Sequence, residues 1–334
     1  MDPDPLSDVL RSVRLRGSVF YYVSFRDEWA AETPDSPALA AALMPDAEHV
    51  IAYHMLAKGT GWAAVEGLAP VRLTQGDIVL FPRGDAHAIS CAPGVRALPD
   101  DSDWRYTTRN DPKPIALVYH RGVLRPDASA PAGEAASIVI CGFIGCDIRP
   151  FNPLIGAMPR LLHQSADGLM PWLAPVLDQA VKESQRGRAG SSAVLERVSE
   201  MVFVDAARRY LESLPEQTPG WLGALRDRYV GRAIALMHAR PAHPWTVDEL
   251  GRQVGLARSA LHARFVELLG QPPMQYLTHW RMQRGAGLLR EGKLTVAAIA
   301  QEVGYDSEAA FARTFKRLVG QPPATWRRAQ GRSN

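Results

Sequence analysis

Residues 246–276 read TVDELGRQVGLARSALHARFVELLGQPPMQY, and residues 295–326 read TVAAIAQEVGYDSEAAFARTFKRLVGQPPATW. The second stretch repeats the first, with glycines 255 and 304 at the same position of each copy. Each copy predicts a helix-turn-helix unit. Two such units in one chain predict a module that reads two neighbouring stretches of DNA.

The residues inside each copy explain why helices form there. Thr246 is a good helix N-cap, and Glu249 follows at the spacing of a capping box. Gly255 ends that helix because glycine tolerates positive φ. The second helix of each copy carries apolar residues at i, i+4, i+7 and i+8, namely Leu261, Phe265, Leu268 and Leu269, then Phe311, Phe315, Leu318 and Val319. Gly-Gln-Pro-Pro follows each helix, and the prolines prevent its continuation.

Residues 274–290, MQYLTHWRMQRGAGLLR, predict a further helix between the two copies. Its candidate core residues are Leu277, Trp280, Leu288 and Leu289. Such a helix would hold the two units at a fixed separation. We therefore expect them to enter successive major grooves, about 34 Å apart on one face of the duplex.

The repeat resembles the AraC/XylS family of transcription regulators, whose signature is this tandem helix-turn-helix. The resemblance covers about the last 100 residues, and its most specific part is residues 304–327, GYDSEAAFARTFKRLVGQPPATWR. The residues that match the family pattern there are Gly304, Tyr305, Ser307, Phe311, Arg313, Phe315 and Pro322.

The resemblance implies base-reading residues on the exposed face of each second helix. By position these are Ser259, His262 and Ala263 in the first copy, and Glu308, Ala309, Ala312 and Arg313 in the second. Arg258 and Arg264 flank the first set and are expected to contact phosphate. Arginine pairs bidentately with guanine and histidine donates to a base acceptor, whereas the alternative for any exposed helical arginine is plain solvation. Ala257 departs from the family at an N-cap that usually holds serine, so the helix after it is expected to start less firmly.

The charge of the chain supports the same division. Residues 230–334 hold 15 Lys and Arg against 7 Asp and Glu, whereas the remainder holds 23 against 28. A basic module attached to a mildly acidic body is typical of a phosphate-binding domain joined to a part with another task. Double-stranded promoter DNA is therefore the expected partner.

The chain as a whole predicts a multidomain protein. At 334 residues it is long enough for two to three domains. The first residues, MDPDPLSDVLRSVRLRG, contain no apolar segment of the kind found in a signal peptide, and no apolar run is long enough to span a bilayer. Three cysteines, an odd number, argue against a secreted disulfide scaffold. A cytoplasmic location without membrane contact is expected.

The N-terminal half carries the pattern of an all-β domain. Short runs rich in Val, Ile, Tyr and Phe lie at residues 19–25, 50–56, 78–81 and 115–119, and Gly and Pro separate them closely. That pattern predicts a double-sheet barrel or jelly roll. Residues 76–87, GDIVLFPRGDAH, resemble the second cupin motif, which indicates a cupin-like barrel.

A metal site in this barrel is doubtful on the sequence. The first cupin motif normally supplies His-x-His and a glutamate, and here His54 stands alone in a plausible strand. His54, His87 and Cys91 remain as candidate ligands, because imidazole and thiolate suit Zn or Fe. The alternative is that both histidines are structural. We therefore expect no metal and no other cofactor.

The N-terminal half also resembles the cupin sensor domain of one branch of the AraC family. The shared stretches are residues 6–21, LSDVLRSVRLRGSVFY, then PRGDAH and IVICG. The resemblance implies a small-molecule effector in the mouth of the barrel, and the candidate contacts are His54, Trp62 and His87.

The same branch includes regulators that respond to oxidants through cysteines. Cys141 matches one sensing position, but the stretch that would hold its partner contains no cysteine. Cys91 and Cys146 are the only substitutes. A redox sensor is thus an alternative hypothesis, and an inert buried thiol is the other.

Residues 171–185 and 191–214 predict two amphipathic helices. In the second, the expected apolar face consists of Val194, Val198, Met201, Val202, Leu211 and Leu214. That face would pack on the barrel or, as the family resemblance implies, form a homodimer.

Together these observations predict a one-component transcription regulator. Residues 1–160 would be a cupin-like effector-sensing domain, 161–228 a helical linker and dimerisation region, and 229–334 an α-helical tandem helix-turn-helix domain. The resemblance favours an activator that works with RNA polymerase, and not an enzyme. The alternatives are a cysteine-based oxidant sensor and a metal-dependent cupin enzyme fused to a DNA-binding domain.

Overall fold

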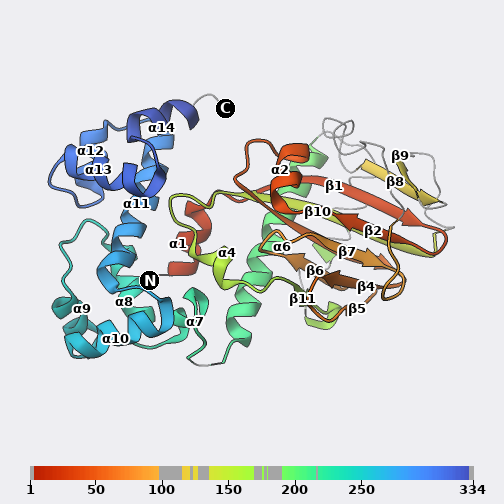
Figure 1. Cartoon of the computed structure of the whole chain (residues 1–334), viewed down its shortest axis with the longest axis horizontal. Helices are drawn as coiled ribbons and strands as arrows, with labels where there is room; N and C mark the ends of the chain where they lie inside the picture. The colour runs from red at the N-terminus through yellow and green to blue at the C-terminus, as the bar shows by residue number, and fades with distance from the viewer. Residues whose placement is uncertain are drawn as a thin grey trace. The chain divides into compact units, whose positions relative to one another are not determined.

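The structure is a computed structural model that describes residues 4–97, 115–120, 123–126, 135–168, 175–176, 179, 190–215 and 217–330. The chain forms two compact units, whose elements are labelled in Figure 1. The β unit comprises residues 15–147 and 158–209, and the helical unit comprises Met1–Arg14, Ile148–Ala157 and Tyr210–Asn334. The domain boundaries expected at residues 160 and 228 stay a prediction, because they concern which parts of the chain fold and act on their own.

The β unit contains two sheets. The larger has the strand order β11-β6-β3-β10-β1-β8-β9, and the smaller has the order β2-β7-β4-β5. Strand β1 lies between β10, to which it is antiparallel, and β8, to which it is parallel. The strand bounds are β1 Arg16–Phe25, β2 Ala30–Thr33, β3 His49–Lys58, β4 Thr60–Val65, β5 Val71–Thr74, β6 Ile78–Phe81, β7 His87–Ser90, β8 Ile115–His120, β9 Val123–Pro126, β10 Ser137–Cys146 and β11 Leu162–Gln164.

One apolar core lies inside this unit and draws on both sheets. Val23 and Phe25 of β1 and Phe81 of β6 are buried in it, together with Ala63 and Ile89 from the smaller sheet. Side chains of alternate residues therefore face inward along each strand, as expected for paired sheets around a core. The predicted all-β cupin-like fold is confirmed, and the four sequence runs correspond to β1, β3, β6 and β8.

The motif at residues 76–87 serves this fold directly. Gly76 and Gly84 have φ values of 91° and 71°, which other residues rarely adopt. Between them Asp77 accepts hydrogen bonds from the backbone N–H groups of Thr74 and Ala166, so it ties the turn before β6 to the chain after β11.

Helix α6 (Ser191–Ser213) confirms the second of the two predicted helices. Its Ser199 hydroxyl lies 2.9 Å from the Tyr53 hydroxyl, on the face of β3 opposite to the core. Val198 and Val202 are buried, but Val194 and Met201 are 47% and 36% exposed. The expected apolar face is therefore covered only in part within the chain, and its role stays a prediction. The other predicted helix, 171–185, lies outside the described residues apart from 175–176 and 179.

The helical unit contains both predicted helix-turn-helix pairs. They are α9 (Val247–Val254) with α10 (Arg258–Leu269), and α12 (Val296–Glu302) with α13 (Glu308–Val319). The Thr246 side chain accepts from the N–H of Glu249, and Ser307 caps α13 in the same way, whereas Ala257 supplies no side-chain cap to α10. Between residues 217 and 330 the structure also contains α7 (Trp221–Arg226), α8 (Val230–Ala239), α11 (Pro273–Glu291) and α14 (Pro323–Gln330).

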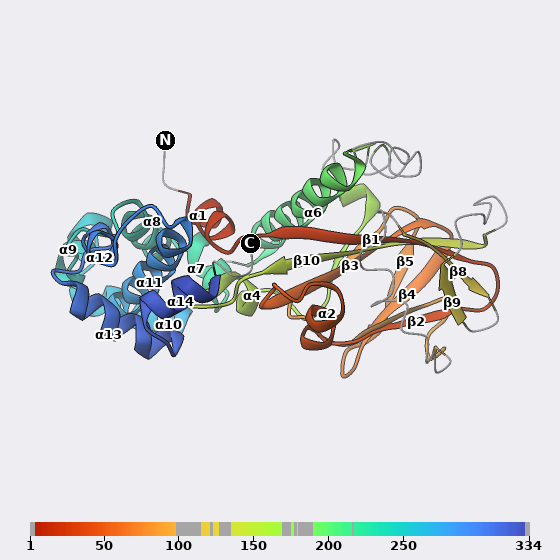
Figure 2. The ribbon, with the colours of Figure 1, turned by 90° about the horizontal axis from the view of Figure 1, so that it is seen from above.

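Helix α11 confirms the predicted connecting helix and is buried along much of its length. Its first half contributes Leu277 and Trp280, each about 1% exposed. Its second half contributes Met282, Ala286 and Leu289 to a core shared with α12, α13 and α14. Tyr276 of α11 also meets Phe265 of α10, so both helix-turn-helix pairs pack on this one helix (Figure 1 and Figure 2).

Two segments from the N-terminal half of the sequence belong to the helical unit, and the sequence did not predict this. They are α1 (Pro5–Ser12) and residues 148–157, which include α4 (Pro153–Ala157). Gln283 of α11 joins them, because its Nε2 donates to the carbonyl of Ser12 and its Oε1 accepts from the N–H of Phe151. Gln283 itself is 1% exposed.

Candidate nucleic-acid interface and sensor cavity

The first recognition surface is the outer face of α10. Arg258, Ser259, His262 and Ala263 are all exposed there, as the sequence pattern predicts. Arg258 lies 3.4 Å from Asp248, but both side chains are more than half exposed, so this ion pair is weak in water. The guanidinium therefore remains available to a phosphate.

Arg264 lies on the same helix but has a structural role. Its Nε donates to the carboxylate of Asp227 at 2.6 Å. That carboxylate also accepts from the N–H groups of Tyr229 and Val230 at the start of α8. Burial would raise the pKa of Asp227, but these hydrogen bonds hold it below its usual range. Arg264 thus fastens α10 to α8 through this ion pair, and its contact with phosphate stays a prediction.

The second recognition surface is the outer face of α13. Glu308, Ala309 and Arg313 are exposed, and Ala312 is half-buried. Lys316 follows Arg313 one turn later and is also exposed. Small side chains beside a long cationic one leave room for a helix to approach base edges, and an arginine can pair with guanine. This face is therefore a candidate for base contact.

Inside the β unit, His54 and His87 form a direct pair. Their Nε2 atoms are 2.8 Å apart, and the two residues are 2% and 5% exposed. His87 Nδ1 lies 2.8 Å from the carbonyl oxygen of Asp85, and its ring stacks on Phe81. Burial lowers the pKa of His54 well below its usual value and that of His87 to about 4, so both rings are neutral at pH 7.

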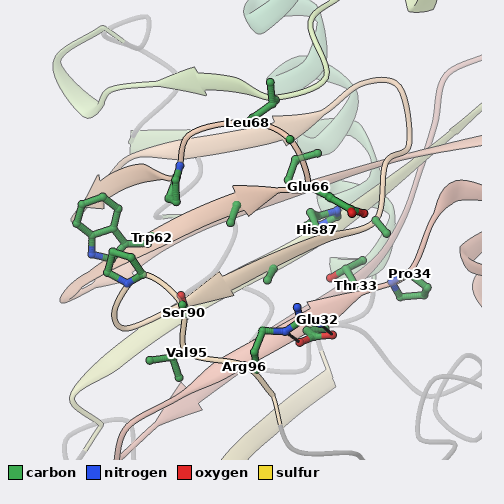
Figure 3. A pocket seen from close by; sticks show the side chains of 18 residues that line it. Glu32, Thr33, Pro34, Trp62, Glu66, Leu68, His87, Ser90, Val95 and Arg96 are labelled. Atoms are coloured by element: carbon green, nitrogen blue, oxygen red, sulfur yellow. Dashed lines mark hydrogen bonds and ion pairs between the residues drawn. The ribbon is translucent and has the colours of Figure 1, made fainter.

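Trp62 lies on β4 of the smaller sheet, on the outer face of that sheet, whereas His54 faces the interior from β3 of the larger sheet. Trp62 is half-buried and lines a surface groove of about 790 Å³ across the smaller sheet. Figure 3 shows Trp62 at one end of this groove and His87 beside Glu66 at the other. The three predicted effector contacts are therefore connected in space. Trp62 and His87 line the same groove, and His87 is hydrogen-bonded to His54.

A second, smaller cavity of about 30 Å³ lies in the barrel interior, on the His54 side of the pair. The strand register places Tyr21, Cys141 and His54 next to each other on β1, β10 and β3, and all three line this cavity. Its remaining wall is largely apolar and includes Phe143, Ile89, Leu117 and Leu124. The sequence alone does not reveal that these three residues are neighbours, because their proximity depends on the pairing of three strands.

Comparison with known proteins agrees with the fold and the two recognition helices. The chain matches the family model described as "Cupin" over residues 4–212 and the "Helix-turn-helix domain" over residues 250–329. It is 30% identical to an AraC-like transcription regulator of Streptomyces lividans over 335 residues, which covers 97% of this chain and 98% of that protein.

The chain belongs to the AraC family of DNA-binding transcription regulators. It is also similar to the HTH-type transcriptional regulator AlkR of Acinetobacter baylyi, with 28% identity over 97% of this chain and 99% of that protein. The crystal structure of ToxT from Vibrio cholerae O395 aligns over 95% of this chain and 97% of that chain with 11% identity and a TM-score of 0.34.

The cysteines of this AraC-family regulator are separate thiols in the described residues. Cys141 and Cys146 are buried on opposite faces of β10, and Cys91 is half-buried after β7, where it accepts a hydrogen bond from the N–H of Trp29. Burial raises the pKa of Cys141 to about 12 and also raises that of Cys146. Neither buried thiol has the low pKa that makes a sensing cysteine reactive.

Within the described residues, no group of three or more His, Cys, Asp or Glu side chains is arranged to hold a metal ion. The Nε2 atoms of His54 and His87 are 2.8 Å apart, which is a hydrogen-bond distance. Two imidazole nitrogens that each lie about 2.0–2.1 Å from one zinc ion would be roughly 3.3 Å apart in a tetrahedral site.

Among the helices described, none is both long and apolar enough to cross a membrane.

The burial of the cysteines predicts an order of modification. At pH 8 a pKa of about 12 leaves on the order of one Cys141 thiol in 10⁴ as thiolate, so the native protein should be alkylated by iodoacetamide at Cys91 first. Peptide mass spectrometry over time measures this order, with urea-unfolded protein as the control in which all three react. Equal rates for Cys141 and Cys91 in the native protein would contradict the assignment.

Proposed function

We propose that this regulator binds double-stranded promoter DNA with α10 and α13 and that a small molecule bound in the β unit controls transcription. The observation that supports it is the pairing of two exposed recognition faces on one buried helix, α11. The DNA-contacting residues in this proposal are Arg258, Ser259, His262, Ala263, Glu308, Ala309, Ala312 and Arg313. Arg264, which also holds Asp227, is proposed to contact phosphate beside them.

Arg313→Ala tests the second recognition face. Because a bidentate arginine–guanine pair discriminates by about 1–3 kcal/mol, the variant should lose that much affinity on the cognate site and lose preference at one base pair. Arg258→Ala, the matched control, should weaken all sequences evenly and reduce the salt slope. Electrophoretic shifts at fixed salt measure both, and an unchanged Arg313→Ala affinity would remove Arg313 from the interface.

We propose the barrel as the effector site, with His54, Trp62 and His87 as contacts. The groove of about 790 Å³ has the volume of small-molecule sites, and the histidine pair leads from it to the interior cavity. Among the described residues, His54 and His87 have no third His, Cys, Asp or Glu beside them that could complete a metal site. The barrel is therefore proposed to be a sensor without a cofactor rather than a metal-dependent enzyme.

A route from this site to the DNA-binding helices follows the chain itself. Strand β1 starts four residues after α1 ends at Ser12, and β10 ends two residues before Ile148. Both neighbouring segments are held by Gln283 of α11. A shift of β1 or β10 around a ligand would thus act on the helix that carries both recognition helices. The resulting change in promoter occupancy would act on RNA polymerase, as an activator.

A homodimer remains part of this proposal. Val194 and Met201 lie seven residues apart on α6 and are among the exposed large hydrophobic residues, with Arg197 between them. An apolar stripe at this spacing is suited to pairing with a second helix.

The redox alternative makes the opposite mutational prediction. If a ligand is the input, Cys141→Ser should still respond in a promoter-fusion reporter and His54→Ala should not, because the histidine lies at the proposed ligand site. If an oxidant is the input, the reverse should hold, and thiol trapping should show Cys141 joined to Cys91, Cys146 or a second chain. Induction that survives both substitutions would rule out both inputs.

A further inference from the structure

His54 brings a polar atom to the interior cavity, beside the hydroxyl of Tyr21. His54 Nδ1 is buried, and it has no hydrogen-bond partner in the described structure. Its ring lines the cavity, whose other walls are mostly apolar. A buried nitrogen without a partner is unfavourable, so it marks a place where a bound molecule gains affinity.

The neighbours of His54 decide whether this nitrogen donates or accepts. The carbonyl oxygen of Asp85 only accepts, so His87 Nδ1 carries the proton of its ring. Because His87 is neutral, its Nε2 is an acceptor, and His54 Nε2 must donate to it across 2.8 Å. His54 is neutral as well, and its single proton is thereby placed on Nε2. Its Nδ1 is a bare acceptor.

The charge around the cavity restricts the ligand further. Among the described residues that line the cavity there is no Lys or Arg, and the one ionisable carboxylate is that of Glu32. Glu32 is paired with Arg96 at 2.6 Å on the exposed side of β2. A carboxylate ligand would therefore be buried without a cation, and such a charge is expensive to desolvate.

From these observations we propose that the effector is a small neutral molecule of the alcohol or phenol class, whose hydroxyl group donates to His54 Nδ1. This inference rests on the proposed sensing function of the barrel and adds the chemistry of the ligand. The fixed proton order Asp85–His87–His54 presents an acceptor at His54 Nδ1, so a ligand group that meets this atom must donate. The hydroxyl of Tyr21, which lines the same cavity, can donate or accept and does not change this requirement.

The present cavity takes only the hydroxyl end of such a molecule. Its volume of about 30 Å³ is far below the roughly 150 Å³ that holds benzene in an apolar protein cavity. The wall formed by Leu124 belongs to β9, which lies at the edge of the larger sheet and pairs only with β8 in that sheet. The apolar part of the ligand is accommodated by displacement of this edge strand, without breaking the β1–β10–β3 pairing.

Calorimetric titration of the full chain with phenol and with anisole tests the proposal. Both probes carry the same ring, but anisole has one more methyl group and cannot donate a hydrogen bond. Phenol should bind more tightly than anisole to the unsubstituted protein. The ratio of the two affinities should fall about fivefold in His54→Phe, as expected for the loss of one net hydrogen bond. Ile89→Val, the matched control, enlarges the same cavity without changing its polarity and should keep the preference for phenol.

The proton order is measurable without any ligand or any variant. Long-range ¹H–¹⁵N NMR of histidine-labelled protein at pH 7 should show His54 protonated at Nε2 and His87 protonated at Nδ1. A proton on His54 Nδ1 would overturn the proposal, since the cavity would then present a donor. Equal binding of phenol and anisole to the unsubstituted protein would overturn it too.

These outcomes separate the ligand class from the sensing function. Equal binding of the two probes, together with a reporter response to another compound that His54→Ala abolishes, would leave the barrel a sensor and reject the hydroxyl class. A reporter response that no substitution in the barrel alters would reject the sensing function itself.

Discussion

The packing of α11 is the constraint on which the DNA-binding unit depends. One 19-residue helix contacts the first helix-turn-helix pair through Tyr276, whose ring meets Phe265 of α10, and the second through Met282 and Leu289. Burial of each such side chain contributes roughly 1.5–3 kcal/mol, so neither pair can turn freely about the helix. Gly285 keeps the approach close, because a Cβ there would lie 2.9 Å from the Phe311 ring. The distance between the two recognition helices is therefore a property of α11.

The same helix is the natural point for control. His238 stacks on Trp280 with ring centroids 3.7 Å apart, its Nε2 lies 2.8 Å from the Tyr276 hydroxyl, and its Nδ1 faces Asp8 of α1 at 3.5 Å. Gln283 adds hydrogen bonds to the end of α1 and to residue 151. The two chain segments that lead into and out of the barrel strands are thus attached to α11 by buried polar groups. Buried polar contacts are costly to break singly, which suits an element with discrete arrangements.

The sequence predicted the helical pairs well because their signals are local. N-caps at Thr246 and Ser307, terminating glycines and a 3.6-residue apolar period all lie within single helices. It also named His54 and His87 as candidate effector contacts, but it showed neither their hydrogen bond nor the ion pair of Arg264 with Asp227. Nor did it place Trp62 on the outer face of its sheet. Those facts depend on pairings between strands and helices distant in the chain. The packing of α1 and residues 148–157 in the helical unit could not be predicted for the same reason. Gln283 is more than 130 residues from both of its partners, Ser12 and Phe151.

The fixed spacing set by α11 is tested most directly by altering the DNA. A high-affinity site selected from random duplexes should show two protected major-groove segments one helical turn apart, and insertion of five base pairs between them should reduce affinity to the level of a single half-site. Insertion of a full turn should not restore it, because a rigid helix cannot lengthen. Hydroxyl-radical footprinting with titration of both inserted duplexes measures this. Full affinity on the five-base-pair insertion would show that the two units move independently and would contradict the account.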